Sequence, residues 1–167
     1  MSYKWNTRTE LLLGAERMEY LSHCHVLVVG LGGVGAYAAE QICRAGIGHM
    51  TIVDADTVND SNINRQLPAL HSTLGMQKAE VVGQRLLDIN PRLKLTILNE
   101  FLRDERTEEV LSAQKYDFIV DAIDSLSPKA YLLYHAYRRE IPIVSSMGAG
   151  AKIDPSQVKI ADISKTC

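Results

Sequence analysis

The chain has 167 residues, which is the size of one domain and is enough to bury a sizeable core. Its 46% hydrophobic and 23% charged residues are those of an ordinary globular protein, and its net charge of −2 argues against nucleic-acid binding through overall positive charge without excluding a local basic patch. No apolar run approaches the roughly 20 residues of a membrane span, and residues 1–6 lack the apolar core of a signal peptide, so we expect a cytoplasmic protein with no membrane contact.

Strand and helix patterns alternate along the chain. A short apolar run at 26–29, ending in glycine, is typical of a strand buried on both faces. Apolar residues at helical spacing follow it at 34–45. Further strands are predicted at 50–53, 93–98, 118–120 and 141–145, and further helices at 77–89, 105–114 and 128–139. This order predicts an α/β fold, a Rossmann-like, doubly wound, mainly parallel sheet with helices on both faces.

The tail at 153–167 carries Val158, Ile160 and Ile163, and we expect it to add one more strand. The chain then stops at Cys167 without a capping helix or a polar tail. We therefore expect it to be a fragment of a longer protein.

The three cysteines, Cys24, Cys43 and Cys167, lie far apart, and the sequence contains no Cys-x-x-Cys pair. A structural zinc site of that type is therefore not expected in this segment. We predict that Cys24 and Cys43 are small, buried apolar residues.

A glycine-rich segment, Gly30-Leu31-Gly32-Gly33-Val34-Gly35, joins the strand at 26–29 to the helix after it. Glycines there permit a tight turn and let backbone N–H groups approach a phosphate, which the helix N-terminus attracts. Asp54 follows the next strand about 20 positions later, a spacing that suits a carboxylate accepting hydrogen bonds from ribose hydroxyls. The pattern favours an adenine nucleotide over a structural turn without a ligand. Alone it does not separate ATP from NAD.

Residues after Asp54 favour ATP. They are Asp56, the run Ser61-Asn62-Ile63-Asn64-Arg65-Gln66, and Lys78. A triphosphate carries more charge than a pyrophosphate, and transfer of its α-phosphoryl group requires cations, which Arg65 and Lys78 would supply. The amide-rich run suits a loop that makes directed hydrogen bonds, although on its own it fits a solvated turn before a helix equally well.

Asp121-Ala122-Ile123-Asp124 comes just after the strand at 118–120, and ligands of open α/β sheets collect at the carboxyl ends of strands. A carboxylate there can hold Mg²⁺ against phosphate oxygens. We choose Asp124, because Asp121 is closer to the strand and is expected to face inward or to cap a helix. The alternative for Asp124 is a helix N-cap, a role that Ser125 or Ser127 would serve equally well.

These motifs resemble the ThiF/MoeB/HesA family, the ubiquitin-activating-like adenylyltransferases, in order and spacing from about Arg8 to Ile163. The resemblance implies one ATP-binding adenylation domain over residues 1–167, truncated at its C-terminal end. It implies that Asp54 binds the ribose, with Asp56 in the same site, and that Asp124 holds Mg²⁺. The residues around the phosphates would be Asn62, Arg65, Gln66 and Lys78.

The family is dimeric, and an N-terminal arginine reaches into the partner's site. By resemblance Arg8 takes that place in a homodimer. The alternatives are that Arg8 is a surface arginine on an N-terminal helix and that Arg17, a weaker candidate, takes the role. The residues implied in catalysis are then Arg8, Arg65, Lys78 and Asp124.

Within the family the chain is most similar to the branch of the tRNA threonylcarbamoyladenosine dehydratases. The segments that carry this similarity are Asn64-Arg65-Gln66, 69–75, 148–155 and 161–166. The lack of Cys-x-x-Cys agrees, because activators of sulfur carriers usually hold zinc, although such cysteines could lie beyond Cys167. The expected partner is therefore tRNA.

The resemblance implies that a carboxylate attacks the α-phosphorus of ATP, displaces pyrophosphate and becomes an adenylate, and that attack within the same nucleoside closes a ring and releases AMP. An alternative substrate is the C-terminal glycine of a ubiquitin-like sulfur carrier. A third hypothesis is an NAD-binding dehydrogenase or a nucleotide sensor without catalysis. Arg65, Lys78 and Asp124 argue against it.

Overall fold

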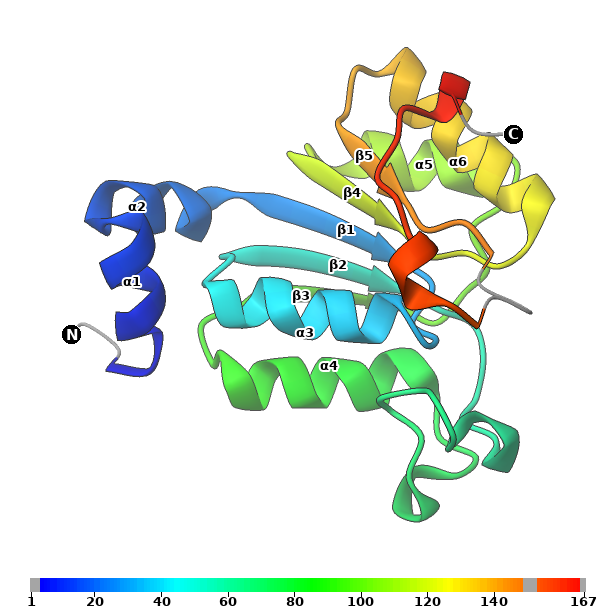
Figure 1. Cartoon of the computed structure of the whole chain (residues 1–167), viewed down its shortest axis with the longest axis horizontal. Helices are drawn as coiled ribbons and strands as arrows, with labels where there is room; N and C mark the ends of the chain where they lie inside the picture. Colours follow the sequence, from blue (N-terminus) through cyan, green and yellow to red (C-terminus); the bar gives the residue numbers. More distant parts are fainter. Residues whose placement is uncertain (1–3, 149–152, 166–167) are drawn as a thin grey trace.

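The computed structural model describes residues 4–148 and 153–165, and its core is a five-stranded sheet in which every pairing is parallel (Figure 1). The strands are β1 (His25–Val29), β2 (His49–Val53), β3 (Lys94–Leu98), β4 (Phe118–Asp121) and β5 (Ile143–Ser145). Their order is β3-β2-β1-β4-β5. The chain therefore winds outward from β1 in both directions, which confirms the predicted doubly wound sheet.

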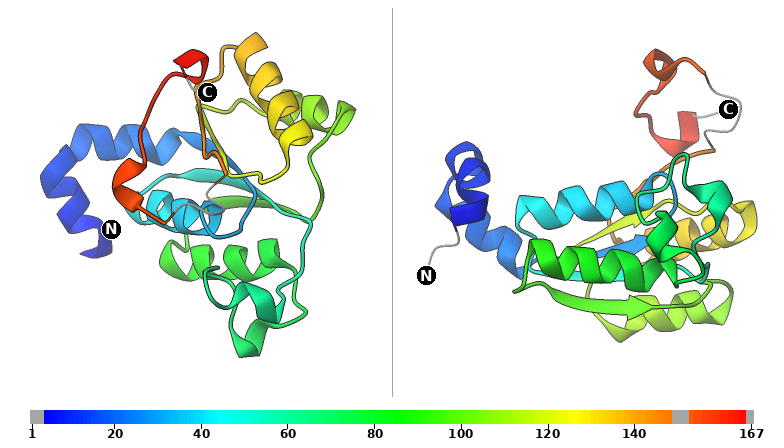
Figure 2. Two further views of the ribbon diagram at one scale, coloured as in Figure 1. Left: turned by 45° about the vertical axis from the view of Figure 1, so that its right-hand side comes forward. Right: turned by 90° about the horizontal axis from the view of Figure 1, so that it is seen from below.

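Helices cover both faces of this sheet. The described α-helices are α1 (Thr7–Leu13), α2 (Ala15–His23), α3 (Gly35–Ala45), α4 (Lys78–Ile89), α5 (Glu105–Ala113) and α6 (Leu126–Arg138). The α3–α4 pair lies on one face and the α5–α6 pair on the other (Figures 1 and 2). None of the helices in the described ranges combines the length and apolar character that crossing a membrane would require.

The central strand β1 contributes to two hydrophobic cores. Val26 and Val28 pack in the core on the α3–α4 side, and Leu27 and Val29 pack in the core on the α5–α6 side. Because successive strand residues point to opposite faces, a strand that is covered on both sides must be apolar at every position. This explains why the sequence shows a continuous apolar run there.

Every strand and helix predicted between positions 26 and 145 is present, with ends that differ by one or two residues. β5 begins at Ile143 instead of Ile141, because Pro142 has no N–H for the ladder, although its carbonyl oxygen accepts from the Ile119 N–H at 2.9 Å. Cys24 and Cys43 are free and buried, as predicted. Burial raises the pKa of the Cys43 thiol to about 11.

The strand predicted in the tail is wrong for its described part, 153–165. That segment forms two single turns of 3₁₀-helix, Pro155–Gln157 and Ile163–Lys165, joined by extended chain. Val158 and Ile160 are 80% and 101% exposed. Apolar alternation is insufficient without a neighbouring strand to pair with, and this segment, here called the C-terminal arm, stands away from the sheet (Figure 2). Residues 149–152 and 166 of the segments that resemble the dehydratase branch lie outside the described residues.

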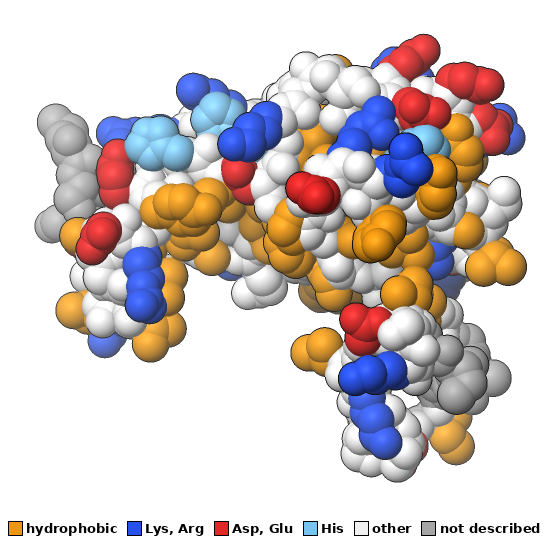
Figure 3. Space-filling view, turned by 90° about the horizontal axis from the view of Figure 1, so that it is seen from above, with side chains coloured by type: hydrophobic (Ala, Val, Ile, Leu, Met, Phe, Trp, Pro, Cys, Tyr) orange, Lys and Arg blue, Asp and Glu red, His pale blue; other side chains and the backbone are white. Residues whose placement is uncertain are grey.

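A second projection is the N-terminal hairpin, formed by α1 and α2. It extends from the amino ends of the strands (Figure 1), and neither helix has a buried residue. Leu11, Leu12 and Tyr20 are exposed on it. The hairpin and the C-terminal arm flank a hollow in the surface (Figure 3).

Candidate functional site

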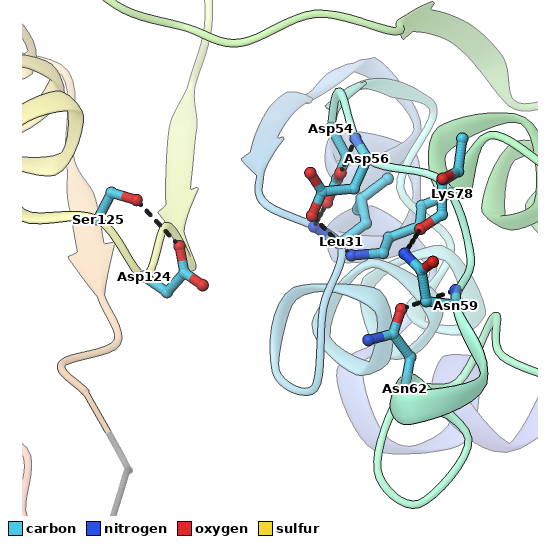
Figure 4. Close-up of polar contacts among 9 residues, drawn as sticks. Leu31, Asp54, Asp56, Asn59, Asn62, Lys78, Asp124 and Ser125 are labelled. Carbon is cyan, nitrogen blue, oxygen red and sulfur yellow. Dashed lines mark hydrogen bonds and ion pairs between the residues drawn. The ribbon is translucent and has the colours of Figure 1, made fainter.

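The predicted site residues other than Arg8 gather at the carboxyl ends of β1, β2 and β4. The glycine loop, residues 30–35, follows β1, Asp54 follows β2, and Asp124 lies three residues beyond the end of β4. Figure 4 shows the Asp54 group on one side of the glycine loop and Asp124 on the other. The sheet order thus brings together motifs that are far apart in the sequence.

The four glycines of the loop have two different roles. Gly30 has a φ of +86°, and a Cβ there would meet the Ala122 carbonyl oxygen at 2.7 Å. A Cβ on Gly35 would overlap the Gly30 carbonyl oxygen. These two positions therefore require glycine for close packing.

Gly32 and Gly33 have more room. A Cβ on Gly32 would meet only the Gln66 side chain, at 3.6 Å, and one on Gly33 would meet Arg65 at 3.6 Å or more. Both distances are ordinary contacts. The middle of the loop is therefore open for a ligand to approach its backbone, and Arg65 and Gln66 lie beside it.

Asp54 is held by backbone N–H groups. Its Oδ2 accepts from Leu31 N at 2.6 Å and its Oδ1 from Asp56 N at 2.8 Å. Burial raises the pKa of Asp54, and these two hydrogen bonds act in the opposite direction. Each carboxylate oxygen has a second lone pair, so Asp54 can accept two further hydrogen bonds, as a ribose diol would require.

Asp56 holds Lys78 in place. Its carboxylate accepts from the Lys78 Nζ at 2.8 Å, and its carbonyl oxygen accepts from the Lys78 N–H at 2.9 Å. The Lys78 side chain is only 5% exposed, whereas that of Asp56 is 53% exposed. The sequence indicated both residues but not that they form an ion pair with each other.

The amide-rich run lies in a loop, as predicted, and begins with a short 3₁₀-helix, Asp60–Asn62. The buried Asn62 accepts from the Asn59 N–H at 3.0 Å, which fixes the start of the turn. The Arg65 guanidinium donates to the carbonyl oxygen of Ser61 at 3.0 Å and folds back along the loop. Among the buried polar side-chain atoms of the described residues, Gln66 Oε1 is one of two without a hydrogen-bond partner. The Nε2 atom of the same side chain is 3.6 Å from the position of a Cβ on Gly32, so a ligand that approached the loop here and offered a donor to Oε1 would satisfy it.

Asp124 is exposed and accepts from the Ser125 hydroxyl at 3.2 Å. The N-cap position of α6 belongs to Ser125, so the alternative role for Asp124 is not adopted. Within the described ranges, no group of three or more His, Cys, Asp or Glu could hold a metal ion by itself. Mg²⁺ at Asp124 would therefore need phosphate oxygens and water to complete its shell. That donor set suits Mg²⁺, which usually binds through one or two carboxylates together with phosphates.

Asp121 faces inward, one of the two expectations for it, and forms a buried network that the sequence did not reveal. Its Oδ2 accepts from Lys129 Nζ and from Ser145 Oγ, both at 2.6 Å. Its Oδ1 accepts from the Ile123 N–H at 3.0 Å. Lys129 also donates to Ser145 Oγ and to the Ser146 carbonyl oxygen, each at 3.0 Å. Asp121 is fully buried and Lys129 is 6% exposed.

Arg8 lies elsewhere. It is exposed on α1, in the N-terminal hairpin near the amino ends of the strands, whereas the glycine loop is at their carboxyl ends (Figure 1). Within one chain Arg8 is therefore not part of this site. Arg17 is likewise exposed, on α2 of the same hairpin.

Comparison with known proteins agrees with this geometry. A model of the ThiF family matches residues 3–165. The chain is 40% identical over 169 residues to the tRNA threonylcarbamoyladenosine dehydratase of Escherichia coli K12, an alignment that covers 99% of this chain and 63% of that protein. It is 33% identical over 139 residues to the molybdopterin-synthase adenylyltransferase of Salmonella typhimurium LT2, covering 83% of this chain and 54% of that one.

The same similarity holds in three dimensions. The crystal structure of E. coli tRNA N6-threonylcarbamoyladenosine dehydratase, TcdA, in complex with ATP matches the chain with a TM-score of 0.94 at 39% identity. The match covers 98% of this chain and 67% of the TcdA chain. The chain thus spans about two thirds of the length of these proteins.

Proposed function

Because the chain belongs to the ThiF family, we propose that it uses ATP to activate a carboxylate by adenylation, and that this carboxylate is the threonyl group of threonylcarbamoyladenosine in tRNA. The observation that carries the proposal is the 40% identity to the E. coli dehydratase across 99% of this chain. The 33% identity to the molybdopterin-synthase adenylyltransferase makes a protein carrier the weaker candidate substrate. A tRNA substrate fits the cytoplasmic location that the sequence suggests.

The nucleotide would lie across the glycine loop. Asp54 would accept from the ribose hydroxyls, the backbone of Gly32 and Gly33 would approach the phosphates, and Lys78 and Arg65 would supply positive charge. The free acceptor on Gln66 supports a ligand at this place. Asn62 would hold the loop in position through its hydrogen bond to the backbone.

The reaction needs no general base in its first step, because the attacking carboxylate is already ionised. A carboxylate oxygen bonds to the α-phosphorus as the bond to the bridging oxygen of pyrophosphate breaks, and charge builds on the phosphate oxygens. Lys78 and Arg65 would stabilise that charge. In the second step a group of the same nucleoside attacks the activated carbonyl carbon and AMP leaves, and the high effective concentration of an intramolecular group favours ring closure.

Magnesium, when bound at Asp124, would screen phosphate charge and polarise the phosphate oxygens. The chain contributes one exposed carboxylate to this site, held next to Ser125.

We further propose that the protein works as a homodimer in which Arg8 enters the partner's site. Its solvent-accessible surface is 10774 Å², compared with about 8,200 Å² expected for a folded monomer of 18.5 kDa. An apolar groove of about 450 Å³, lined by Ile42, Phe118 and Val120 among others, lies on the α3 side of the sheet. A second copy that covered this groove and the exposed side chains of the N-terminal hairpin would remove the surplus apolar surface from water.

The test is product formation on tRNA that carries threonylcarbamoyladenosine, with ATP and Mg²⁺, followed by mass spectrometry of the nucleosides. We expect loss of the mass of one water from the modified nucleoside and release of AMP. ATP turnover with a ubiquitin-like sulfur carrier, and none with this tRNA, would transfer the proposal to the protein carrier. Tight NAD binding without ATP binding would refute adenylation altogether.

A further inference from the structure

The buried network around Asp121 begins three residues before Asp124 in the chain and uses all three donors of the Lys129 ammonium group. The three Nζ donors of Lys129 reach Asp121, Ser145 and Ser146. Since an ammonium group has only three donors, Lys129 has none left for a ligand, and at 6% exposure it does not reach the solvent. Lys129 can therefore affect a bound nucleotide only through the residues to which it is hydrogen-bonded.

What Lys129 holds is the turn that carries Asp124. On one side, its side chain fixes the Asp121 carboxylate, whose other oxygen accepts from the Ile123 N–H at 3.0 Å. On the other side, the Lys129 backbone N–H donates to the Ser125 carbonyl oxygen at 3.3 Å, in the first turn of α6. Asp124 is the residue between these two anchored positions.

The same turn packs against the glycine loop. Ala122 donates its N–H to the Val29 carbonyl oxygen at 2.8 Å, and its own carbonyl oxygen lies 2.7 Å from the position that a Cβ on Gly30 would take. A shift of residues 122–124 would therefore move Asp124 relative to the phosphate-facing loop. Because Asp124 itself is exposed, little else in the described chain holds it besides this backbone and Ser125.

We propose that Lys129 is a positioning residue that, through Asp121, holds Asp124 where it can share a magnesium ion with the phosphates of ATP. This inference rests on the proposed function. It predicts that loss of Lys129 removes the gain in ATP affinity that Mg²⁺ gives. The affinity without Mg²⁺, to which Asp54 and Lys78 contribute, should stay unchanged. Loss of a residue that served only the stability of the fold would lower ATP affinity equally with and without Mg²⁺.

The experiment measures ATP affinity by calorimetry twice for each variant of the full chain, once with Mg²⁺ and once with EDTA. For the wild type we expect tighter binding with Mg²⁺, and for Asp124→Asn we expect the ratio of the two dissociation constants to fall to near unity. Lys129→Met should behave like Asp124→Asn, with the EDTA value unchanged. The combination of both changes should lose no more than Asp124→Asn alone, because both act on the same ion.

Removal of Lys129 leaves Asp121 buried without its partner, which can prevent folding. The paired variant Asp121→Leu with Lys129→Met removes both charges and still releases the Ile123 N–H, so it should also lose the magnesium gain. Arg85→Met is the matched control. It breaks the ion pair of Arg85 with Glu40 between α3 and α4, away from the site, and should keep the gain.

Retention of the magnesium gain in either folded variant would overturn the proposal, as would an equal loss of affinity with Mg²⁺ and with EDTA. Failure of both variants to fold would also overturn it, by assigning the network to stability alone. A wild type that binds no ATP under either condition would instead refute the proposed function, and the two failures are thus distinguishable.

Discussion

Asp54 and Lys78 are both largely withdrawn from water in the absence of a nucleotide, and the chain satisfies them by different means. Asp54 accepts hydrogen bonds from two backbone N–H groups, which oppose the rise in its pKa that burial causes. Lys78 is met by a full opposite charge on Asp56. A ribose would add hydrogen bonds to Asp54 without displacing its backbone donors, and a phosphate would accept from the two Nζ donors of Lys78 that its bond to Asp56 does not use.

We predict that Asp54→Ala weakens ATP binding by about 1–3 kcal/mol, roughly fivefold to 150-fold, because a charged acceptor is removed. Isothermal titration would measure the change. Asp117→Ala is the matched control, since the Asp117 carboxylate also accepts a backbone N–H, that of His25, but at the opposite end of the sheet. Equal losses of affinity in the two variants would mean that the effect reflects stability and not the ribose.

At the scale of elements, the glycine loop combines two tightly packed ends and an open middle within six residues. Gly35 begins α3 and packs on Gly30, which in turn packs on the turn after β4. Gly32 and Gly33 sit between them with space on their open side. The sequence motif does not separate these roles, because all four positions are simply glycine.

Gly35→Ala should lower the free energy of unfolding by about 1–3 kcal/mol, because the new methyl group overlaps backbone that cannot rotate away. Gly32→Ala should change stability by less than about 0.5 kcal/mol, since its methyl group would meet only the Gln66 side chain at 3.6 Å. It should nevertheless weaken ATP binding by standing between the backbone and the phosphates. Urea denaturation and nucleotide titration of both variants would check this. A Gly32→Ala variant with unchanged affinity would place the phosphates elsewhere.

The alternation of strands and helices was predictable from the sequence because β1, β2 and β4 are mostly buried and the helices that pack on the sheet each have one apolar face. The glycine loop and Asp54 were predictable for a similar reason, since they depend on spacing along one strand–helix–strand unit. The Asp121–Lys129–Ser145 network was not, because Ser145 joins it only when β5 pairs beside β4. The strand predicted in the tail is absent because it too depends on a neighbour, and no strand pairs with that segment in the described part of the chain. Its apolar pattern is real, but strand pairing is decided by neighbours that a local pattern does not contain.

At the scale of the whole molecule, two projections leave apolar side chains exposed that nothing in the described chain covers. The N-terminal hairpin and the C-terminal arm carry exposed apolar side chains and enclose a hollow (Figure 3). Arg8, the one candidate residue far from the site, is on the hairpin. A partner copy would account for both observations at once.

If Arg8 acts in the partner's site, Arg8→Ala and Lys78→Ala chains should each bind ATP weakly, while their mixture recovers one strong site for each mixed dimer. Calorimetry gives the number of strong sites, and subunit exchange is verified with differently tagged chains. Arg17→Ala in place of Arg8→Ala is the control and should leave binding unchanged. Verified exchange without recovery would show that Arg8 acts within its own chain or not at all.

The ion pair between Lys78 and Asp56 also has a consequence for the entropy of binding. A lysine that is free in solvent gives up about 2 kcal/mol of side-chain entropy when it is fixed on a ligand. Lys78 is already fixed in the folded chain, so that loss belongs to folding and not to the arrival of a phosphate. If a phosphate accepted from the two Nζ donors that Asp56 does not use, the ion pair would stay in place. Nucleotide binding at this lysine would then cost little side-chain entropy.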